Sequence, residues 1–460
     1  MKLKTLISGG TAMALAATIS LVSVPLAHAD QTTPGSYNTV QSHRLLDTRR
    51  GFGAPMAAVA AHATLTFAAT DNTEGHPVAL ALNVTAVSPT AAGSLTVFAA
   101  GTPRPYASNL NFQAGQNVPN LVVTAVPQTG VNAGKVSIYN GSAGTVQLLA
   151  DIHGYFTGGT NTGVPGTFVP LPSSQRVLDT RKGIGAPRAR VAARSGLTLQ
   201  VTGMDGVPAD ASAVVANITA VQGNNRGYVT AYEGEPRPLA SNLNYEMRQD
   251  RANLALVTVA TGGTISLFNG GTFSTVDLVV DVTGYFVGGT PAADGAFIPS
   301  TAFRVFDSRS PGGAPAGALT TSKIQIFPPN DPTFAFFKAV VVNVTAVQPE
   351  SAGYLTTYDG VGPLPSVSSS NFVPKHDVAG AVILPVATDG TISIYNGSYG
   401  NVDLVVDVSG FFYALPGSQP AGVTRTAAVP AKQRIDAALG AMKKFSATPH
   451  STPVSITHTK

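Results

Sequence analysis

The sequence predicts an all-β protein made of three tandem copies of one domain, each an antiparallel β-sandwich of the jelly-roll kind. Composition is the first observation behind this prediction. Of the 460 residues, 44% are apolar but only 11% are charged, against about 25% charged in an ordinary soluble protein. The 48 glycines and 33 prolines indicate many turns. Frequent Val and Thr suit pleated, half-buried strands, so the composition favours an all-β chain.

Five short motifs that return in the same order are the second observation. An opening Arg-x-x-Asp-[Thr/Ser]-Arg lies at 44–49, 176–181 and 304–309, and a closing Asp-x-x-Gly-aromatic-Phe lies at 151–156, 281–286 and 407–412. Between them stand Asn-[Val/Ile]-Thr-Ala-Val (83–87, 217–221, 343–347), Ser-Asn (108–109, 241–242, 370–371) and aromatic-Asn-Gly (139–141, 268–270, 395–397). A fixed period of this kind is typical of repeat architectures. We therefore expect β-domain copies at 37–159, 168–289 and 297–413.

Alternation of apolar and polar residues with a period of two is the third observation. In the segment 276–282, Leu278, Val280 and Val282 share one face, whereas Asp277 and Asp281 lie on the other. This alternation is typical of a β-strand with one face in a core. Segments of this kind, separated by Gly, Pro or Asn, number about eight in each copy, which fits a closed or two-sheet antiparallel domain.

A single β-propeller built from half-repeats is the alternative architecture. Residues 84–87 lead into a second strand at 93–98, and residues 123–126 lead into one at 134–139. The two half-repeats lie about 40 residues apart, which is also the length of a propeller blade. The opening segment of each copy has no counterpart in the half-repeats, and this favours three sandwiches.

The N-terminus predicts a secreted protein. Lys2 and Lys4 precede a small and apolar stretch, and Ala27-His28-Ala29 fits a cleavage site, so residues 1–29 are expected to be a signal peptide. No other segment is long and apolar enough to predict a membrane span. The chain has no cysteine, which excludes disulfides, thiol catalysis and cysteine-based metal sites.

The C-terminal segment 414–460 differs from the rest in charge. It contains six Lys and Arg residues against one Asp, and Ile435, Leu439 and Met442 recur at helical spacing. We expect a basic tail with a short amphipathic helix. The body of the chain is slightly acidic without the tail and the signal peptide, and an acidic body argues against nucleic-acid binding.

The motifs resemble a repeat common in secreted proteins of Streptomyces and related actinobacteria. The resemblance rests on the opening Arg-x-x-Asp-Thr-Arg, on Asn-Val-Thr-Ala-Val, on Ser-Asn-Leu-Asn and on the closing Asp-Val-x-Gly-Tyr-Phe, and it covers nearly all of 37–413. It implies export and modular use, and it transfers no catalytic residues. Copy 3 departs from the pattern, because Phe372-Val373 follows Ser370-Asn371 where the family has Leu-Asn.

No pattern in the sequence indicates an enzyme, and we expect no catalytic residue. None of the eight His residues recurs at an equivalent place in two copies; His153, for example, aligns with Thr283 and Ser409. Metalloprotease, nucleophile-elbow, phosphate-loop and dinucleotide motifs are all missing.

Repeated Arg and Asp residues are the main polar signal in a chain with so few charges. We expect them to form a structural network that joins the first and last strands of each copy, because a carboxylate on a buried strand needs a bidentate Arg or several donors. The predicted network consists of Arg44, Asp47, Arg49, Asp151, Arg176, Asp179, Arg181, Asp281, Arg304, Asp307, Arg309 and Asp407. A carbohydrate or anion site at the Arg residues, and Ca²⁺ held by Asp and Asn oxygens, are the alternatives.

The Ser-Asn-Leu-Asn stretches are the candidate ligand-binding segments. Their candidate residues are Asn109, Asn111, Asn242, Asn244 and Asn371. The leading hypothesis is a secreted, multivalent binding or cell-surface protein that recognises a glycan or another envelope component, since several weak sites on one chain give avidity. The alternatives are an extracellular protein-binding partner, such as an inhibitor, carrier or assembly component, and a hydrolase with an unrecognised site.

Overall fold

The computed structural model describes residues 36–70, 77–157, 166–288, 295–311, 313–328, 334, 336–413, 437 and 440. The predicted signal peptide lies outside the described residues. So does the predicted tail helix, except that Ala437 and Gly440 are helical and exposed. Within the described part of the chain, no helix is long and apolar enough to cross a membrane.

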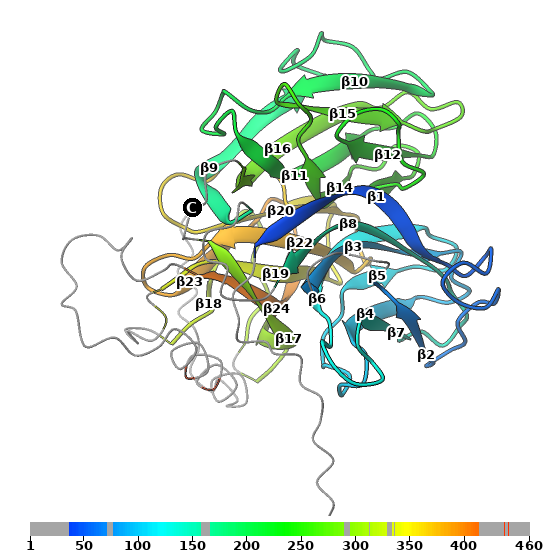
Figure 1. Cartoon of the computed structure of the whole chain (residues 1–460). Coiled ribbons are helices and arrows are strands. Elements are labelled where there is room, and N and C mark those ends of the chain that lie inside the picture. Colours follow the sequence, from blue (N-terminus) through cyan, green and yellow to red (C-terminus); the bar gives the residue numbers. More distant parts are fainter. Residues whose placement is uncertain are drawn as a thin grey trace, which may run out of the picture.

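The described chain is built from antiparallel β-strands, which confirms the all-β prediction (Figure 1). There are twenty-four strands among the described residues, eight in each of the three copies. They form six four-stranded sheets, the number that the propeller alternative expects, and each copy contributes two of them.

In copy 1 the two sheets interleave along the chain. The first sheet has the order β1 (Tyr37–Asp47), β8 (Gln147–Thr157), β3 (Pro77–Val87), β6 (Val118–Ala125). The second has the order β2 (Thr64–Ala68), β7 (Lys135–Asn140), β4 (Gly93–Ala99), β5 (Leu110–Phe112). The consecutive strands β3 and β4 therefore belong to different sheets, whereas β3 and β6, the first strands of the two half-repeats, pair within one sheet.

Copies 2 and 3 repeat this topology strand for strand. In copy 2 the sheets are β9 (Phe168–Asp179), β16 (Asp277–Val287), β11 (Ala211–Val221), β14 (Arg251–Thr258) and β10 (Ser195–Gln200), β15 (Thr264–Asn269), β12 (Gly227–Tyr232), β13 (Leu243–Tyr245). In copy 3 they are β17 (Ala296–Asp307), β24 (Asp403–Tyr413), β19 (Phe337–Val347), β22 (Val378–Pro385) and β18 (Thr321–Gln325), β23 (Thr391–Asn396), β20 (Gly353–Tyr358), β21 (Ser370–Phe372).

Each copy has its own hydrophobic core, formed by residues from both of its sheets. In copy 1, Leu82 and Val84 from the first sheet cluster with Val97 and Ile138 from the second. Copies 2 and 3 contain equivalent clusters. The alternation along 276–282 works as expected, since Leu278, Val280 and Val282 all enter the core of copy 2.

A fourth hydrophobic cluster contains residues of all three copies. It is formed by the opposite faces of the buried strands, so that Ala79 and Ala81 of β3 enter this central cluster while Leu80 and Leu82 enter the core of copy 1. Burial on both faces explains why β3 is apolar along almost its entire length. In Figure 1 the three copies surround this centre, and β6, β14 and β22 contact one another there.

Six aromatic side chains give the central cluster a cyclic order. The first strand of each copy carries an aromatic ring that packs on a Phe in the last strand of another copy: Tyr37 on Phe286 at 4.3 Å between ring centroids, Phe168 on Phe412 at 4.5 Å, and Phe297 on Phe156 at 4.3 Å. Copy 1 thus contacts copy 2, copy 2 contacts copy 3, and copy 3 contacts copy 1.

Candidate functional site

The structure joins the first and last strand of each copy by a buried Arg–Asp pair. In copy 2, Arg176 of β9 lies opposite Asp281 of β16 in the strand register. Its Nε donates to Asp281 Oδ1 at 2.8 Å and its Nη2 to Oδ2 at 3.1 Å. The equivalent Nε–Oδ1 distances are 2.8 Å for Arg44–Asp151 and 2.9 Å for Arg304–Asp407. This bidentate geometry is the strongest form of such a pair.

A second Arg–Asp pair follows at the turn after each first strand. Asp179 Oδ1 accepts hydrogen bonds from the backbone amide of Arg181 at 3.1 Å and from its Nε at 2.9 Å. Asp47 with Arg49 and Asp307 with Arg309 repeat the arrangement. The first Arg of each motif also approaches the turn Asp, at 3.2 Å for Arg44–Asp47. The twelve residues of the predicted network therefore lie in three clusters of four.

The two carboxylates of a cluster differ in their electrostatics. Burial raises the pKa of Asp281, and the hydrogen bonds from Arg176 oppose that rise. The hydrogen bonds from Arg181 lower the pKa of Asp179, although desolvation acts in the other direction. The second Arg remains partly open to solvent, with 40% of the Arg49 side chain and 41% of the Arg181 side chain exposed. It is the cation that a ligand can reach.

Two of the five candidate Asn residues have a structural role. Asn109 and Asn242 are buried, and their Oδ1 atoms accept hydrogen bonds at 2.7 Å from the backbone amides of Val97 and Ala231. These bonds link the short strands β5 and β13 to their neighbouring strands. The side-chain oxygens of Asn109 and Asn242 are thereby used inside the fold.

The predicted alignment of Asn371 is wrong by two residues. In the strand register Tyr354 lies opposite Asn371, as Ser94 lies opposite Asn111 and Tyr228 lies opposite Asn244. Asn371 therefore corresponds to Asn111 and Asn244. Phe372 corresponds to Phe112 and not to a leucine, so the departure of copy 3 from the motif pattern lies elsewhere than we expected.

Three other Asn residues, which sequence reasoning did not select as site residues, link the copies. Asn83 Nδ2 donates to the carbonyl oxygen of Ser241 at 2.5 Å, Asn217 Nδ2 to that of Ser368 at 2.5 Å, and Asn343 Nδ2 to that of Ser108 at 2.7 Å. Each bond crosses from one copy to the next in the cyclic order. The sequence did contain a signal for these residues, because a polar residue recurs at the same position of an otherwise apolar strand in all three copies.

Arg and Asn residues of neighbouring copies line grooves at the boundaries between copies. A groove of about 680 Å³ contains Arg44, Arg49 and Phe52 of copy 1 together with Tyr228 and Asn244 of copy 2. Its counterpart between copies 2 and 3 measures about 340 Å³. That second groove is lined by Arg176, Arg181, Tyr354 and Asn371, among others.

The boundary between copies 3 and 1 differs from the other two. Here the exposed ring of Tyr106 lies over the Arg304 guanidinium, with 4.7 Å between Cζ and the ring centroid. Ser94, and not a tyrosine, stands opposite Asn111 in copy 1. The third boundary thus carries a cation–π contact.

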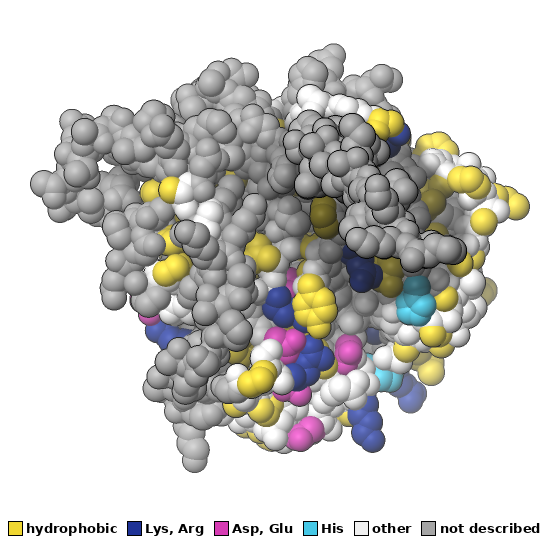
Figure 2. Space-filling view, turned by 90° about the horizontal axis from the view of Figure 1, so that it is seen from below, with side chains coloured by type: hydrophobic (Ala, Val, Ile, Leu, Met, Phe, Trp, Pro, Cys, Tyr) yellow, Lys and Arg dark blue, Asp and Glu magenta, His cyan; other side chains and the backbone are white. Residues whose placement is uncertain are grey.

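Charges of both signs are mixed on the surface. On the face shown in Figure 2, Lys and Arg side chains lie directly beside Asp and Glu side chains near the middle of the view. Among the described residues, no group of three or more His, Asp or Glu side chains is arranged to hold a metal ion.

No protein-family model matches the chain, and no curated protein matches it. Similar solved structures include the N-terminal CBM22-1-CBM22-2 tandem domain from Paenibacillus barcinonensis Xyn10C, at 10% identity and a TM-score of 0.17, covering 55% of this chain and 100% of that chain. Another is an archaeal virus structure described as a triple jelly roll fold with a turret assembly, at 10% identity and a TM-score of 0.16, covering 83% of this chain and 91% of that chain. TM-scores this low support no functional conclusion.

Proposed function

We propose that this chain is a secreted, multivalent binding protein that recognises a glycan or another component of a cell envelope, without catalysing a reaction. The observation that carries the proposal is the groove in which Arg49 of one copy and Asn244 of the next copy lie together. The signal-peptide pattern at residues 1–29 supports export.

The finer architecture supports a binding surface made by several copies. We infer three two-sheet sandwiches grouped about one axis, because β3 and β4 belong to different sheets and each pair of sheets encloses its own core. One sheet of each copy faces the central cluster, and the other sheet lies outside it. This arrangement places a boundary between every two copies, and each boundary brings an opening motif close to the strand that carries Asn111, Asn244 or Asn371.

The chemistry of the grooves suits hydroxyl and carboxylate groups. The Arg49 guanidinium is oriented by Asp47, since Nε and Nη2 bind its two carboxylate oxygens at 2.9 and 2.8 Å. The side chain is thereby held in place although 40% of it stays exposed, and a pre-positioned donor group lowers the entropy cost of binding. Asn244 can both donate and accept, and Tyr228 offers an aromatic face.

Binding is best tested with the mature chain, residues 30–460, on isolated cell walls and on a glycan array. We expect retention of the wild type, weaker retention of Arg49→Gln and of Arg181→Gln, and loss in the double variant because avidity disappears. Arg226→Gln, an exposed change outside both grooves, is the matched control. Undiminished retention of the double variant would refute the groove assignment, and capture by an extracellular protein with no glycan bound would favour a protein partner.

A further inference from the structure

The three boundaries between copies contain equivalent spaces, and only one of them is open. Each space is lined by the bulged part of a first strand and by the end of a strand from the next copy in the order: Tyr232 faces copy 1, Tyr358 faces copy 2 and Phe98 faces copy 3. The spaces measure about 10 Å³ between copies 1 and 2, about 20 Å³ between copies 3 and 1, and about 340 Å³ between copies 2 and 3.

A longer bulge is one reason for the open cavity. In copy 1 the register breaks between Thr39 and His43, and in copy 3 between Pro299 and Phe303, which leaves three residues in each bulge. In copy 2 the corresponding break runs from Pro170 to Gln175 and contains four residues. The additional residue bends the strand further away from its neighbour, and residues 171–174 form one wall of the cavity.

Smaller side chains are the second reason. Ala381 of copy 3 occupies the register position that Leu121 and Leu254 hold in the other copies. Thr283 stands where copy 1 has His153, whose ring fills the boundary between copies 1 and 2. Both Ala381 and Thr283 line the open cavity, so the space follows from the sequence of this boundary.

Two buried polar atoms of residues that line this cavity have no hydrogen-bond partner. They are Asn217 Oδ1 and Thr357 Oγ1, from copies 2 and 3, and both residues are more than nine-tenths buried. Asn83 and Asn343 accept a bond on the equivalent oxygen from Asn253 and Asn120. At the Asn217 boundary the corresponding residue of copy 3 is Gly380, by register, so the side-chain amide that serves the other two boundaries is missing here. Buried polar groups without a partner are uncommon, and these two, which are closed to solvent, mark this boundary as the less completely packed one.

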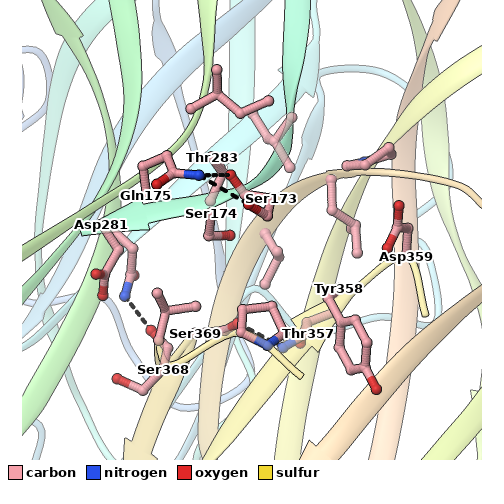
Figure 3. A pocket seen from close by; sticks show the side chains of 18 of the residues that line it. Ser173, Ser174, Gln175, Asp281, Thr283, Thr357, Tyr358, Asp359, Ser368 and Ser369 are labelled. Carbon is pink, nitrogen blue, oxygen red and sulfur yellow. Dashed lines mark hydrogen bonds between the residues drawn. The ribbon is translucent and has the colours of Figure 1, made fainter. Parts of the chain in front are cut away.

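The remaining walls combine hydroxyl groups with apolar surface (Figure 3). Figure 3 shows Ser173, Ser174, Ser368 and Ser369 around the cavity, with Tyr358 and Asp359 on the other side. Leu364 and Leu384 are among the apolar residues of the wall, and the described residues that line it include no Lys, Arg or His. The Asp281 carboxylate is already bound by Arg176. The cavity therefore suits an uncharged ligand with several hydroxyl groups and an apolar C–H face.

We propose that the cavity between copies 2 and 3 binds one uncharged sugar unit, whose hydroxyl groups meet the serine hydroxyls of the walls and whose C–H face packs on the apolar side. The volume lies in the range of small-molecule sites. This site adjoins the groove between copies 2 and 3, because residues 365–368 line both, but its walls contain none of the arginines that line the grooves of the proposed function. The sugar can be a free monosaccharide or the end of a glycan chain.

The full mature chain can be tested by ligand-observed NMR with the methyl glycosides of glucose, galactose and N-acetylglucosamine. We expect at least one of them to bind the wild type and to raise its Tm. Ala381→Leu introduces the residue that copies 1 and 2 carry at this position, and we expect it to weaken binding at least tenfold with no loss in Tm. A trisaccharide that ends in the same sugar separates the two sources, because a site restricted to free sugars would exclude it.

The matched control is Arg181→Gln, which changes a groove and should leave glycoside binding intact. Conversely, Ala381→Leu should leave wall retention through the grooves intact, so that failure of the cavity proposal and failure of the proposed function are distinguishable. Should Ala381→Leu not fold, Thr283→His, which introduces the copy 1 residue, replaces it with the same expectation. The proposal is wrong if none of the three glycosides binds, or if the filled cavity binds as well as the wild type.

Discussion

Asn83 and Ser241 lie 158 residues apart in the sequence, yet the side-chain amide of Asn83 donates to the Ser241 carbonyl oxygen at 2.5 Å. The bond joins copy 1 to copy 2, and Asn217 and Asn343 repeat it around the circle of copies. Together with the central aromatic rings, these bonds make one molecule of three repeats.

The three linking Asn residues should differ in their contribution to stability. Asn343 makes two links, since its Nδ2 donates to Ser108 and its Oδ1 accepts from Asn120 at 3.0 Å. Asn217 makes only the first kind of link, because its Oδ1 has no partner. We expect Asn343→Ala to cost about 1–3 kcal/mol of unfolding free energy, and roughly 1 kcal/mol more than Asn217→Ala. Urea unfolding of the full chain measures both, and equal losses would contradict the assignment.

The Arg176–Asp281 pair should be structural. Asp281 is 1% exposed, and its removal leaves the guanidinium of Arg176 without its bidentate partner. Breaking a buried pair by removing one partner costs about 3–5 kcal/mol, so Asp281→Ala should lower the Tm sharply. Asp210→Ala, at an exposed position of the same copy, should stay within about 0.5 kcal/mol of the wild type. An unchanged melt for Asp281→Ala would show that the pair is not structural.

An isolated copy should not be a folded monomer. Residues 166–288 alone would expose Phe168, Val215, Leu256 and Phe286, which are buried in the central cluster of the full chain. Exposed apolar patches of this kind drive association or prevent folding. We expect the fragment to self-associate or to remain unfolded in analytical ultracentrifugation and circular dichroism, whereas the full chain keeps this cluster buried. A soluble, folded, monomeric fragment would show that the central cluster is dispensable.

Local features of the fold could be predicted from the sequence, because each has a short-range signature. The alternation along 276–282 indicates which residues of β16 enter the core. The pairing of Arg176 with Asp281 follows from two recurring charges at the two ends of a copy that has few others. A charge within a buried strand needs a partner, and the motif order left few candidates.

The arrangement of the copies could not be predicted in the same way. Strand β3 is apolar on both faces, so its sequence does not indicate that Ala79 and Ala81 face a second cluster. The cavity depends on one additional residue in a bulge and on Ala381 in place of a leucine. Neither position lies within a recurring motif, so a comparison of motifs does not detect them. The two-residue error at Asn371 arose because copy 3 has Ser369 and Ser370 where copies 1 and 2 have Asn and Leu, so that its single Ser-Asn pair falls on the second Asn of the motif.

His153 should make the boundary between copies 1 and 2 sensitive to pH. Its ring is buried between Ser42 and Asn242, with Nδ1 2.8 Å from Ser42 Oγ and Nε2 3.5 Å from Asn242 Nδ2. If Asn242 donates to Nε2, the ring is neutral and its single proton lies on Nδ1, where it is donated to Ser42. Desolvation by burial lowers the pKa of His153 from 6.5 to about 4.

The direction of the effect follows from this lowered pKa. The unfolded chain binds the His153 proton near pH 6.5, whereas the folded chain binds it only near pH 4. The stabilisation is therefore complete above pH 6.5 and is lost as the pH falls toward 4, by about 1.4 kcal/mol per pH unit within that window. His153→Thr introduces the residue of copy 2 and removes the titrating group. It should lower stability at pH 7.5, where two hydrogen bonds are lost, but it should flatten the pH dependence between 6.5 and 4. Urea unfolding of both proteins across this range measures the difference, and parallel curves would mean that His153 is not the group responsible.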